Sequence, residues 1–479
     1  MEKVRTRFAP SPTGFMHLGG LRTALYAYLY AKHFDGDFIL RIEDTDKERF
    51  VEGALEVIYS SLNESGLKYD EGPDVGGNYG PYVQSERKQI YMEYAKKLID
   101  LGGAYYCFCT KERLEGLTDE NGNRKYDKHC LKISKEEAEQ RIKNGEPFVI
   151  RQNIPVEGTS SYEDLIYGTI NVDYSDLEDN ILIKSDGMPT YNFANVIDDH
   201  LMKISHVIRG TEYLSSTPKY NLMYDAFGWE RPVYIHLPTI MKDSTRKLSK
   251  RYGDANFDDF ISKGYLEEAI INYVALLGWC PKNNAEKMTI PEMIERFDLS
   301  GISKSPSIFD DVKLRWLNSE YLKAMDDDEF LKRSTPFFKN SAVYDKFDIS
   351  KIAKLIKSRI EILSDIPSKV EFLAKYNDFD VSLYENQKQK SNIELAKTVV
   401  PFIINSISSI ENFSNNEIYT TLQEKANEIN IKSKTLFYIM RIALTGLDVT
   451  PGGATEIAEI LGKNECLNRL NKAFKNLNK

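Results

Sequence analysis

Two short segments, far apart in the chain, limit the folds that this sequence can adopt. Residues 10–20 read PSPTGFMHLGG and follow the apolar run 4–8, which is typical of a buried strand. A strand that turns sharply into a helix leaves backbone N–H groups and the positive end of the helix dipole facing an anion. Much later, residues 247–251 read KLSKR and form a compact basic segment. Together the two segments predict a site that holds the phosphates of ATP from two sides.

The glycines, the histidine and the lysines of these segments are the expected contacts of ATP. Glycines let the backbone approach a ligand closely, and a histidine can donate a hydrogen bond to a phosphate oxygen. Lysines can stabilise the charge on departing pyrophosphate. The plainer alternative is that the glycines serve only the turn, the histidine caps the helix, and the basic segment is a solvated charge run. The predicted ATP-binding residues are Gly14, His17, Gly19, Gly20, Lys247, Ser249 and Lys250, of which His17, Lys247 and Lys250 are also the predicted catalytic residues.

The hydrophobic pattern near the N-terminus alternates between strand and helix. Residues 3–8 and 37–43 are predicted strands, and residues 18–34 and 50–65 are predicted helices. Short connections between them indicate βαβ units and a parallel sheet, whose ligands bind beyond the carboxyl ends of the strands. The turn after the first strand and the acidic end of the second both lie there.

Later parts of the chain differ in pattern. The mixed pattern from about 85 to 190 indicates an insertion, helical periodicity dominates from about 255, and no strand pattern appears beyond 330. We therefore predict an α/β fold, with a doubly wound, parallel, Rossmann-type catalytic sheet, an inserted α+β domain and all-helical C-terminal domains. The predicted boundaries are 1–86 and 191–245 for the sheet domain, 87–190 for the insertion, 246–328 for a helical domain that starts with the KLSKR segment, and 329–479 for a second all-helical region.

Composition and charge narrow the cellular setting. The 479 residues suffice for about two to four domains, and no run of about 18 apolar residues occurs, so no membrane partner is expected. Five cysteines, an odd number in a long chain, favour a reducing compartment, and we expect a cytoplasmic location. The net charge is −9, yet residues 331–479 hold 22 Lys and Arg against 17 Asp and Glu. That basic tail suits nucleic-acid phosphates, although a solvated lysine-rich surface explains it at least as well.

At this point the motifs resemble a known family. His17-Leu18-Gly19-Gly20 and the KLSKR segment resemble the HIGH and KMSKS signatures of class I aminoacyl-tRNA synthetases. The surrounding sequence resembles the bacterial-type glutamyl-tRNA synthetases over about residues 1–325, and the rest matches only in length and helical character. The matching runs are 7–14, 40–46, 191–196, 208–215, 275–279 and 313–318.

The resemblance implies an activity, with its cofactors and partners. It implies ATP-dependent ligation of L-glutamate to the 3′ end of tRNA(Glu) through a glutamyl-adenylate, with release of AMP and pyrophosphate and with Mg²⁺ beside ATP. The insertion would bind the acceptor end of tRNA, the next domain its stem, and residues 329–479 the anticodon. Glutamine tRNA stays open as a second partner, and a monomer is the expected state.

The resemblance also assigns a glutamate pocket. Because arginine holds a carboxylate with a charged, bidentate fork, Arg7 and Arg209 would hold the γ-carboxylate, and Glu43 would pair with the α-ammonium. Taken singly, these residues also fit plainer roles, such as an ordinary Arg7–Glu43 ion pair. The remaining residues implied for the pocket are Ala9, Ser11, Tyr191 and Asn195.

A cysteine cluster resembles a zinc site of some family members. Those members have Cys-x-Cys followed by Cys-x-His, and here Cys107, Cys109 and Cys130 occupy the cysteine positions. Lys132 stands where the histidine is expected, and its ammonium cannot bind zinc. We therefore expect no metal at this site, and three reduced cysteines in a small hydrophobic patch are the alternative.

Three other functions remain open on the sequence. A glutaminyl-tRNA synthetase is less consistent with two arginines, since an amide side chain does not call for two cationic forks. A truncated paralogue that glutamylates a modified base lacks an anticodon domain, whereas this chain continues to residue 479. A catalytically silent tRNA-binding protein would not need intact His17, Lys247 and Lys250.

Overall fold

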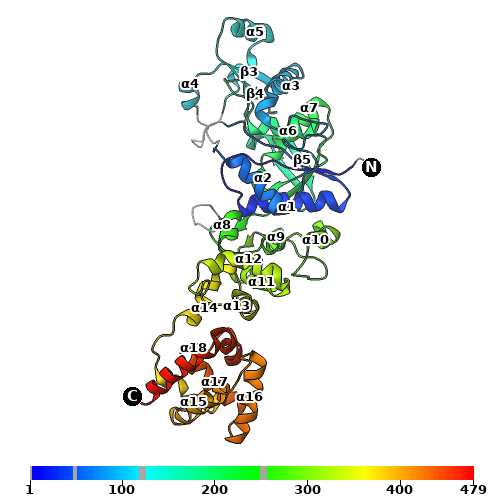
Figure 1. Ribbon diagram of the computed structural model, residues 1–479. Helices are drawn as coiled ribbons and strands as arrows, with labels where there is room; N and C mark the ends of the chain where they lie inside the picture. Colours follow the sequence, from blue (N-terminus) through cyan, green and yellow to red (C-terminus); the bar gives the residue numbers. More distant parts are fainter. Residues whose placement is uncertain (1–2, 47–50, 118–125, 249–255) are drawn as a thin grey trace. The chain divides into compact units, whose positions relative to one another are not determined.

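The chain folds into two compact units. The structure, a computed structural model, describes residues 3–46, 51–117, 126–248 and 256–479. The first unit comprises Met1–Ile261 and Glu267–Asp311, and the second comprises Ser262–Leu266 and Val312–Lys479 (Figure 1). All residues predicted to bind glutamate belong to the first unit.

In the part of the chain that the structure describes, no helix combines the length and the apolar character that crossing a bilayer requires.

The first unit begins with the predicted βαβ arrangement. Strands β1 (Arg5–Phe8) and β2 (Asp37–Leu40) pair in parallel, and helix α1 (Leu18–His33) connects them. The helix is rich in leucine and alanine, which favour helix formation, and it buries these side chains next to β1, whose residues are all buried. Helix α2 (Ala54–Glu64) follows. The order strand–helix–strand–helix is confirmed, with β2 ending at Leu40 instead of at residue 43.

A mixed four-stranded sheet lies next to β1. Its order is β6-β5-β9-β8, and β9 is parallel to both β8 and β5. The backbone N–H of Ser205, just before β8, donates to the carbonyl oxygen of Arg5 at 3.0 Å, which joins this sheet to β1. The strands are β5 (Thr159–Asp164), β6 (Gly168–Asp173), β8 (His206–Gly210) and β9 (Val233–Leu237).

The predicted insertion, residues 87–190, does not end at a sheet boundary. Strands β5 and β6 fall inside that range, yet β5 pairs with β9 at Asp164 and Tyr234. A pairing between residues so distant in sequence leaves no trace in local periodicity. A separate antiparallel sheet of β3 (Ala104–Cys107), β4 (Val149–Gln152) and β7 (Ile181–Ile183) forms the rest of the inserted range. The division into four domains stays a prediction.

The remaining helices of the first unit are labelled in Figure 1. Helices α9 and α10 pack against α1. The helices are α3 (Lys88–Asp100), α4 (Lys111–Glu115), α5 (Lys135–Lys143), α6 (Tyr191–Leu201), α7 (Thr217–Phe227), α8 (Phe257–Ser262, reaching the second unit), α9 (Glu267–Leu276) and α10 (Ile290–Arg296), and the strands are β10 (Ile240–Met241) and β11 (Ser307–Ile308).

The second unit is helical throughout. Residues 312–479 are all described and contain no strand. Helices α15, α17 and α18 pack together, and Arg469 of α18 is buried with its guanidinium donating to the carbonyl oxygens of Phe372 and Leu444, each at 3.0 Å. The helices are α11 (Asp311–Ala324), α12 (Asp327–Lys339), α13 (Ile349–Ile356), α14 (Ile366–Ala374), α15 (Ile393–Ser408), α16 (Asn415–Glu428), α17 (Ser433–Thr445) and α18 (Ala454–Leu477). With parallel strands in the first unit, this confirms the predicted fold class.

Candidate active site

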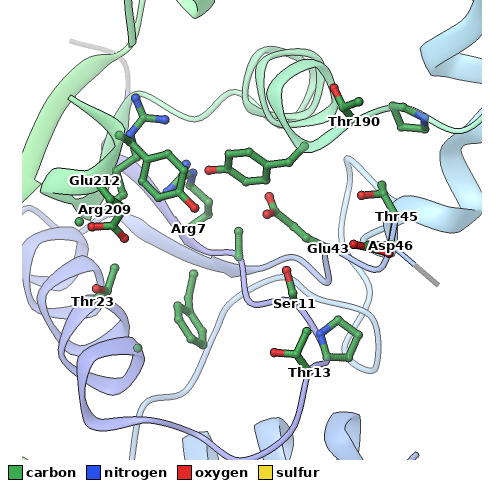
Figure 2. A pocket seen from close by; sticks show the side chains of 18 of the residues that line it. Arg7, Ser11, Thr13, Thr23, Glu43, Thr45, Asp46, Thr190, Arg209 and Glu212 are labelled. Atoms are coloured by element: carbon green, nitrogen blue, oxygen red, sulfur yellow. The ribbon is translucent and has the colours of Figure 1, made fainter. Parts of the chain in front are cut away.

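A pocket of about 940 Å³ opens where β1, β2 and β8 end. This is the carboxyl edge of parallel strands, where the sequence placed the site. Figure 2 shows Arg7, Glu43 and Arg209 on its wall. The lining also includes Ala9, Ser11, Thr13, Gly20, Thr23, Asp46, Tyr191, Glu212 and Tyr213.

One carboxylate, Asp199 of α6, holds two arginines of the site. Arg7 donates to its two oxygens from Nε at 3.0 Å and from Nη2 at 3.3 Å. Arg41, just beyond β2, donates from Nη1 to Asp199 Oδ1 at 2.7 Å. Burial alone would raise the pKa of Asp199, but the charges of Arg7 and Arg41 outweigh it and hold the pKa below its ordinary value. Asp199 is therefore ionised and compensates much of the charge of Arg7.

Glu43 is a buried carboxylate at the pocket wall. It accepts one hydrogen bond from Arg41 Nη2 at 3.1 Å. Burial raises the pKa of Glu43 to about 7, although the charges of Arg41 and Arg7 oppose this shift. The ordinary Arg7–Glu43 pair that the sequence left open is not formed, because Arg7 binds Asp199 and Glu43 binds Arg41.

Arg209, in β8, is a buried cation whose hydrogen-bond partners carry no charge. Its Nε donates to His236 Nε2 at 3.1 Å and its Nη2 donates to the hydroxyl of Thr217 at 2.6 Å. In the described part of the chain, these hydrogen-bond partners are all uncharged. The guanidinium also lies 5.1 Å from the ring centre of Tyr213 and 4.9 Å from that of Tyr220. A buried charge is costly unless an opposite charge meets it, so Arg209 is poised to bind an anion from the pocket.

The other residues predicted to bind glutamate divide into two groups. Ala9, Ser11 and Tyr191 line the same pocket as the arginines. Asn195 is buried one turn further along α6, does not line the pocket, and donates to the carbonyl oxygen of Tyr191 at 2.7 Å. The structure thus brings six of the seven predicted residues to one wall and places Asn195 behind it.

His17 caps helix α1, which is one of the two roles that the sequence allowed. Its Nδ1 accepts from the backbone N–H of Gly19 at 3.0 Å. A neutral ring that accepts at Nδ1 carries its proton on Nε2, so the cap still allows donation to a phosphate. Gly14 has a φ of 121°, which favours glycine, and a side chain at Gly19 would come within 3.2 Å of His17 Nδ1. Of these turn residues, only Gly20 lines the pocket.

The described ends of the KLSKR loop are anchored in the first unit. The backbone N–H of Leu248 donates to the carbonyl oxygen of Ile240 at 3.2 Å, and the backbone N–H of Phe257 donates to the carbonyl oxygen of Met16 at 3.0 Å. Asn256 also forms a backbone bridge with His17. Ser249 and Lys250 lie outside the described residues, and Lys247 is exposed and does not line the pocket. The segment that follows the loop therefore reaches the histidine turn, and the two-sided ATP site stays a prediction.

The three cysteines meet in the inserted range, around a tyrosine. Their sulfur atoms lie within 4.8 Å of one another, and Cys109 and Cys130 are 3.5 Å apart. The hydroxyl of Tyr126 lies 3.3 Å from Cys107 Sγ and 3.5 Å from Cys109 Sγ. Lys132, in the position of the expected histidine, is exposed. Three thiols and a phenol oxygen thus converge on one point.

Sequence reasoning missed the residues that hold the arginines in place. Asp199, His236 and Thr217 lie on elements that meet only in the folded chain. A mostly apolar run that contains a histidine, residues 233–237, and two adjacent acidic residues near the end of α6, Asp198 and Asp199, were the available signals.

Comparison with known proteins assigns this chain to a family. Residues 3–316 match the model of tRNA synthetases class I (E and Q), catalytic domain, and residues 329–474 match an anticodon binding domain. The glutamate–tRNA ligase of Clostridium kluyveri is 54% identical over 481 residues, which cover 100% of this chain and 99% of the relative. That of Clostridium tetani is 55% identical over 472 residues, covering 98% and 96%.

A solved structure agrees with this assignment. The crystal structure of a glutamate tRNA ligase from Elizabethkingia meningosepticum, in complex with its amino acid, has a TM-score of 0.87 and 36% identity and covers 99% of both chains. A second one, from Elizabethkingia anophelis, has the same TM-score of 0.87 and covers 99% of this chain. The chain therefore belongs to the class I tRNA synthetases of the E and Q family.

Proposed function

We propose that this chain ligates L-glutamate to tRNA(Glu). The α-carboxylate of glutamate attacks the α-phosphorus of ATP, a bond to the bridging oxygen breaks, and pyrophosphate leaves. A ribose hydroxyl at the 3′ end of tRNA then attacks the carbonyl carbon of the glutamyl-adenylate, and AMP leaves. Family membership supports the reaction, and the buried Arg209 with its uncharged hydrogen-bond partners is the observation that favours an acidic substrate side chain.

The pocket wall suggests how glutamate is oriented. Arg209, with Arg7 beside it, holds the γ-carboxylate, and Glu43 holds the α-ammonium. The α-carboxylate then faces the side of the pocket that Gly20 and Thr23 of α1 line, next to the helix N-terminus that favours phosphate. Positioning and electrostatics account for such a transfer, so no protein nucleophile is required.

The site must also neutralise the negative charge on the phosphates of ATP. The carboxylates of Asp46 and Glu212 on the wall are hard oxygen donors that suit Mg²⁺, which supplies charge neutralisation to the phosphates of ATP. His17, Lys247 and Lys250 contribute hydrogen bonds and positive charge to the departing pyrophosphate. A catalytically silent tRNA-binding protein would not need these residues.

Charging of purified tRNA tests the proposal. Labelled glutamate and labelled glutamine are offered separately with tRNA(Glu) and with tRNA(Gln). We expect glutamate on tRNA(Glu), and glutamate on tRNA(Gln) would add a second partner without changing the activity. Glutamine on tRNA(Gln) alone would indicate a glutaminyl enzyme, and no product with either amino acid would indicate a silent binding protein.

The raised pKa of Glu43 predicts a pH dependence. The ionised carboxylate binds the ammonium group, and in the free protein its pKa is about 7. Protonation as the pH falls through 7 therefore removes the binding form, and kcat/KM for glutamate at pH 6 should be about one tenth of its plateau above pH 8. Glu43→Gln should remove this step and lower the plateau. A flat profile between pH 6 and pH 8 in tRNA charging would contradict the assigned role.

We also propose that the cysteine cluster holds a structural zinc ion. Lys132 replaces the histidine that the pattern places two residues after Cys130. Tyr126, four residues before Cys130, instead brings its hydroxyl to the sulfurs. Three thiolates with one further donor suit a closed tetrahedral zinc site, and the ion would fix the turn after β3 to the following loop. The expectation of no zinc rests on Lys132 in the place of the expected histidine and on His129, which precedes Cys130 instead of following it.

Metal analysis of the purified protein tests the zinc proposal. We expect about one zinc per chain, and Cys109→Ser should lose most of it together with several degrees of Tm. Cys280→Ser, at an exposed cysteine away from the cluster, is the matched control and should keep the metal. A zinc content near zero after purification with added zinc would restore the sequence-based expectation.

The monomeric state and the cytoplasmic location remain predictions.

A further inference from the structure

Behind Arg209 lies a chain of hydrogen bonds across three adjacent strands. Asp164 ends β5, His236 lies in β9, and Arg209 lies opposite His236 in β8. Asp164 Oδ2 lies 2.7 Å from His236 Nδ1, and His236 Nε2 lies 3.1 Å from Arg209 Nε. The side chains of Asp164 and His236 are 0% exposed, and Arg209 is 5% exposed, so water does not compete for these bonds.

The surroundings of Asp164 fix which nitrogen of His236 carries the proton. Asp164 Oδ1 accepts from the backbone N–H groups of Ile166 and Tyr167 at 2.9 and 2.8 Å, and Oδ2 accepts from the backbone N–H of His236 at 3.0 Å. With three backbone N–H donors directed at it, the carboxylate acts only as an acceptor, so Nδ1 of the imidazole must be the donor. Burial lowers the pKa of His236, which keeps the ring neutral. Its Nε2 then offers a lone pair.

That lone pair determines the orientation of the guanidinium. Arg209 donates Nε–H to His236 and one Nη2–H to Thr217, whose own hydroxyl donates to the carbonyl oxygen of Tyr213 at 2.8 Å. These bonds use the side of the fork formed by Nε and Nη2. The edge formed by Nη1 and Nη2 remains, and it can offer two parallel N–H groups to a carboxylate. Because His236 and Thr217 are neutral, these two hydrogen bonds orient the fork without neutralising its charge.

We propose that Asp164 and His236 are positioning residues for the amino acid side chain: the pair sets the imidazole tautomer that orients Arg209 towards the γ-carboxylate of glutamate. This inference rests on the proposed function. It differs from a role in fold stability alone, because it requires an acceptor at Nε2 and a donor at Nδ1 and not merely a filled volume.

Two substitutions of His236 separate these roles. The amide of His236→Gln can reach the place of Nε2 and can offer its oxygen to Arg209, whereas the shorter amide of His236→Asn lies near Nδ1, can donate to Asp164 and leaves Arg209 Nε without its acceptor. We expect His236→Asn to raise KM for glutamate about 30-fold and His236→Gln less than about fivefold, since an unsatisfied buried donor is costly. KM for ATP should stay within about twofold in both variants.

Asp164→Asn repeats the test without altering the ring. The asparagine best satisfies Ile166 and Tyr167 with its oxygen, so its NH₂ faces His236 and favours the opposite tautomer, with Nε2–H directed at Arg209 Nε–H. We again expect a rise of about 30-fold in KM for glutamate. His206→Gln, at a half-buried histidine of β8 that contacts Ser205 rather than Arg209, is the matched control and should leave KM unchanged.

For every variant, tRNA charging gives KM for glutamate and for ATP, and thermal unfolding gives the stability of the fold. Selective loss of glutamate affinity in His236→Asn and Asp164→Asn, with rescue in His236→Gln, supports the inference. Equal effects of His236→Asn and His236→Gln on KM for glutamate, or equal rises in KM for ATP and for glutamate, overturn the inference. If the His236→Asn protein is insoluble, the KM of Asp164→Asn for glutamate provides the test in its place. Failure of the unmodified protein to charge tRNA with glutamate would instead refute the proposed function.

Discussion

Arg209→Gln should lower kcat/KM for glutamate about a thousandfold in tRNA charging. Glutamine stays polar but is shorter and uncharged, so the γ-carboxylate would enter a buried wall without its principal cation. Leaving one member of a buried ion pair alone costs about 3–5 kcal/mol, and about 1.4 kcal/mol is a factor of ten. Arg7 cannot replace the lost charge, because it is bound to Asp199 through two hydrogen bonds.

A second arginine of the same unit provides the control for Arg209. Arg231 forms an exposed ion pair with Asp225, with side chains 36% and 47% accessible. Arg231→Gln should therefore change kcat/KM less than about twofold, since exposed pairs contribute little. KM for ATP should change little in either variant. A fall of less than tenfold in Arg209→Gln would show that another group holds the γ-carboxylate.

Asp199→Asn should be the most destabilising single substitution among the site residues considered. The carboxylate is the shared counter-ion of Arg7 and Arg41, and the side chains of these two arginines are only 4% and 0% accessible. Asparagine has the same shape but no charge, so both guanidinium groups would remain buried with less compensation. We expect the free energy of unfolding to fall by about 3–5 kcal/mol.

Urea unfolding at pH 7 measures this loss, with Asp225→Asn as the control. Asp225 pairs with the exposed Arg231, so its substitution should cost less than about 1 kcal/mol. A cost below about 1 kcal/mol for Asp199→Asn would mean that solvent or structural relaxation compensates the two arginines, and the electrostatic description of the wall would need revision.

The sequence predicted those parts of the site that local patterns encode. The strand–turn–helix of residues 5–33 is visible because apolar spacing changes from that of a strand to that of a helix on either side of a glycine-containing turn. Since ligands bind at the carboxyl ends of parallel strands, the strand pattern places the turn after the first strand and Glu43 at one edge of the sheet, and the family resemblance adds Arg7. The structure puts both on the wall of one pocket.

The partners of these residues could not be predicted in the same way. Asp199 binds an arginine 192 positions away in the chain, and His236 lies next to Arg209 because their strands pair. Such contacts depend on tertiary packing, and no local spacing records them. Tyr126 is a similar case, since a tyrosine four residues before a cysteine is not a zinc-ligand pattern that sequence reasoning would select. Asn195 donates to its own helix and does not line the pocket, so its contact with glutamate stays a prediction.

If the hydrogen bonds of Arg209 keep it charged and oriented for an acidic side chain, the protein must select glutamate over glutamine. The most direct test is amino-acid-dependent exchange of labelled pyrophosphate into ATP by the unmodified protein, with tRNA(Glu) present and with glutamate or glutamine as the substrate. We expect kcat/KM to be at least about a thousandfold higher for glutamate, because the amide cannot supply the missing negative charge. Equal or faster exchange with glutamine would contradict the account.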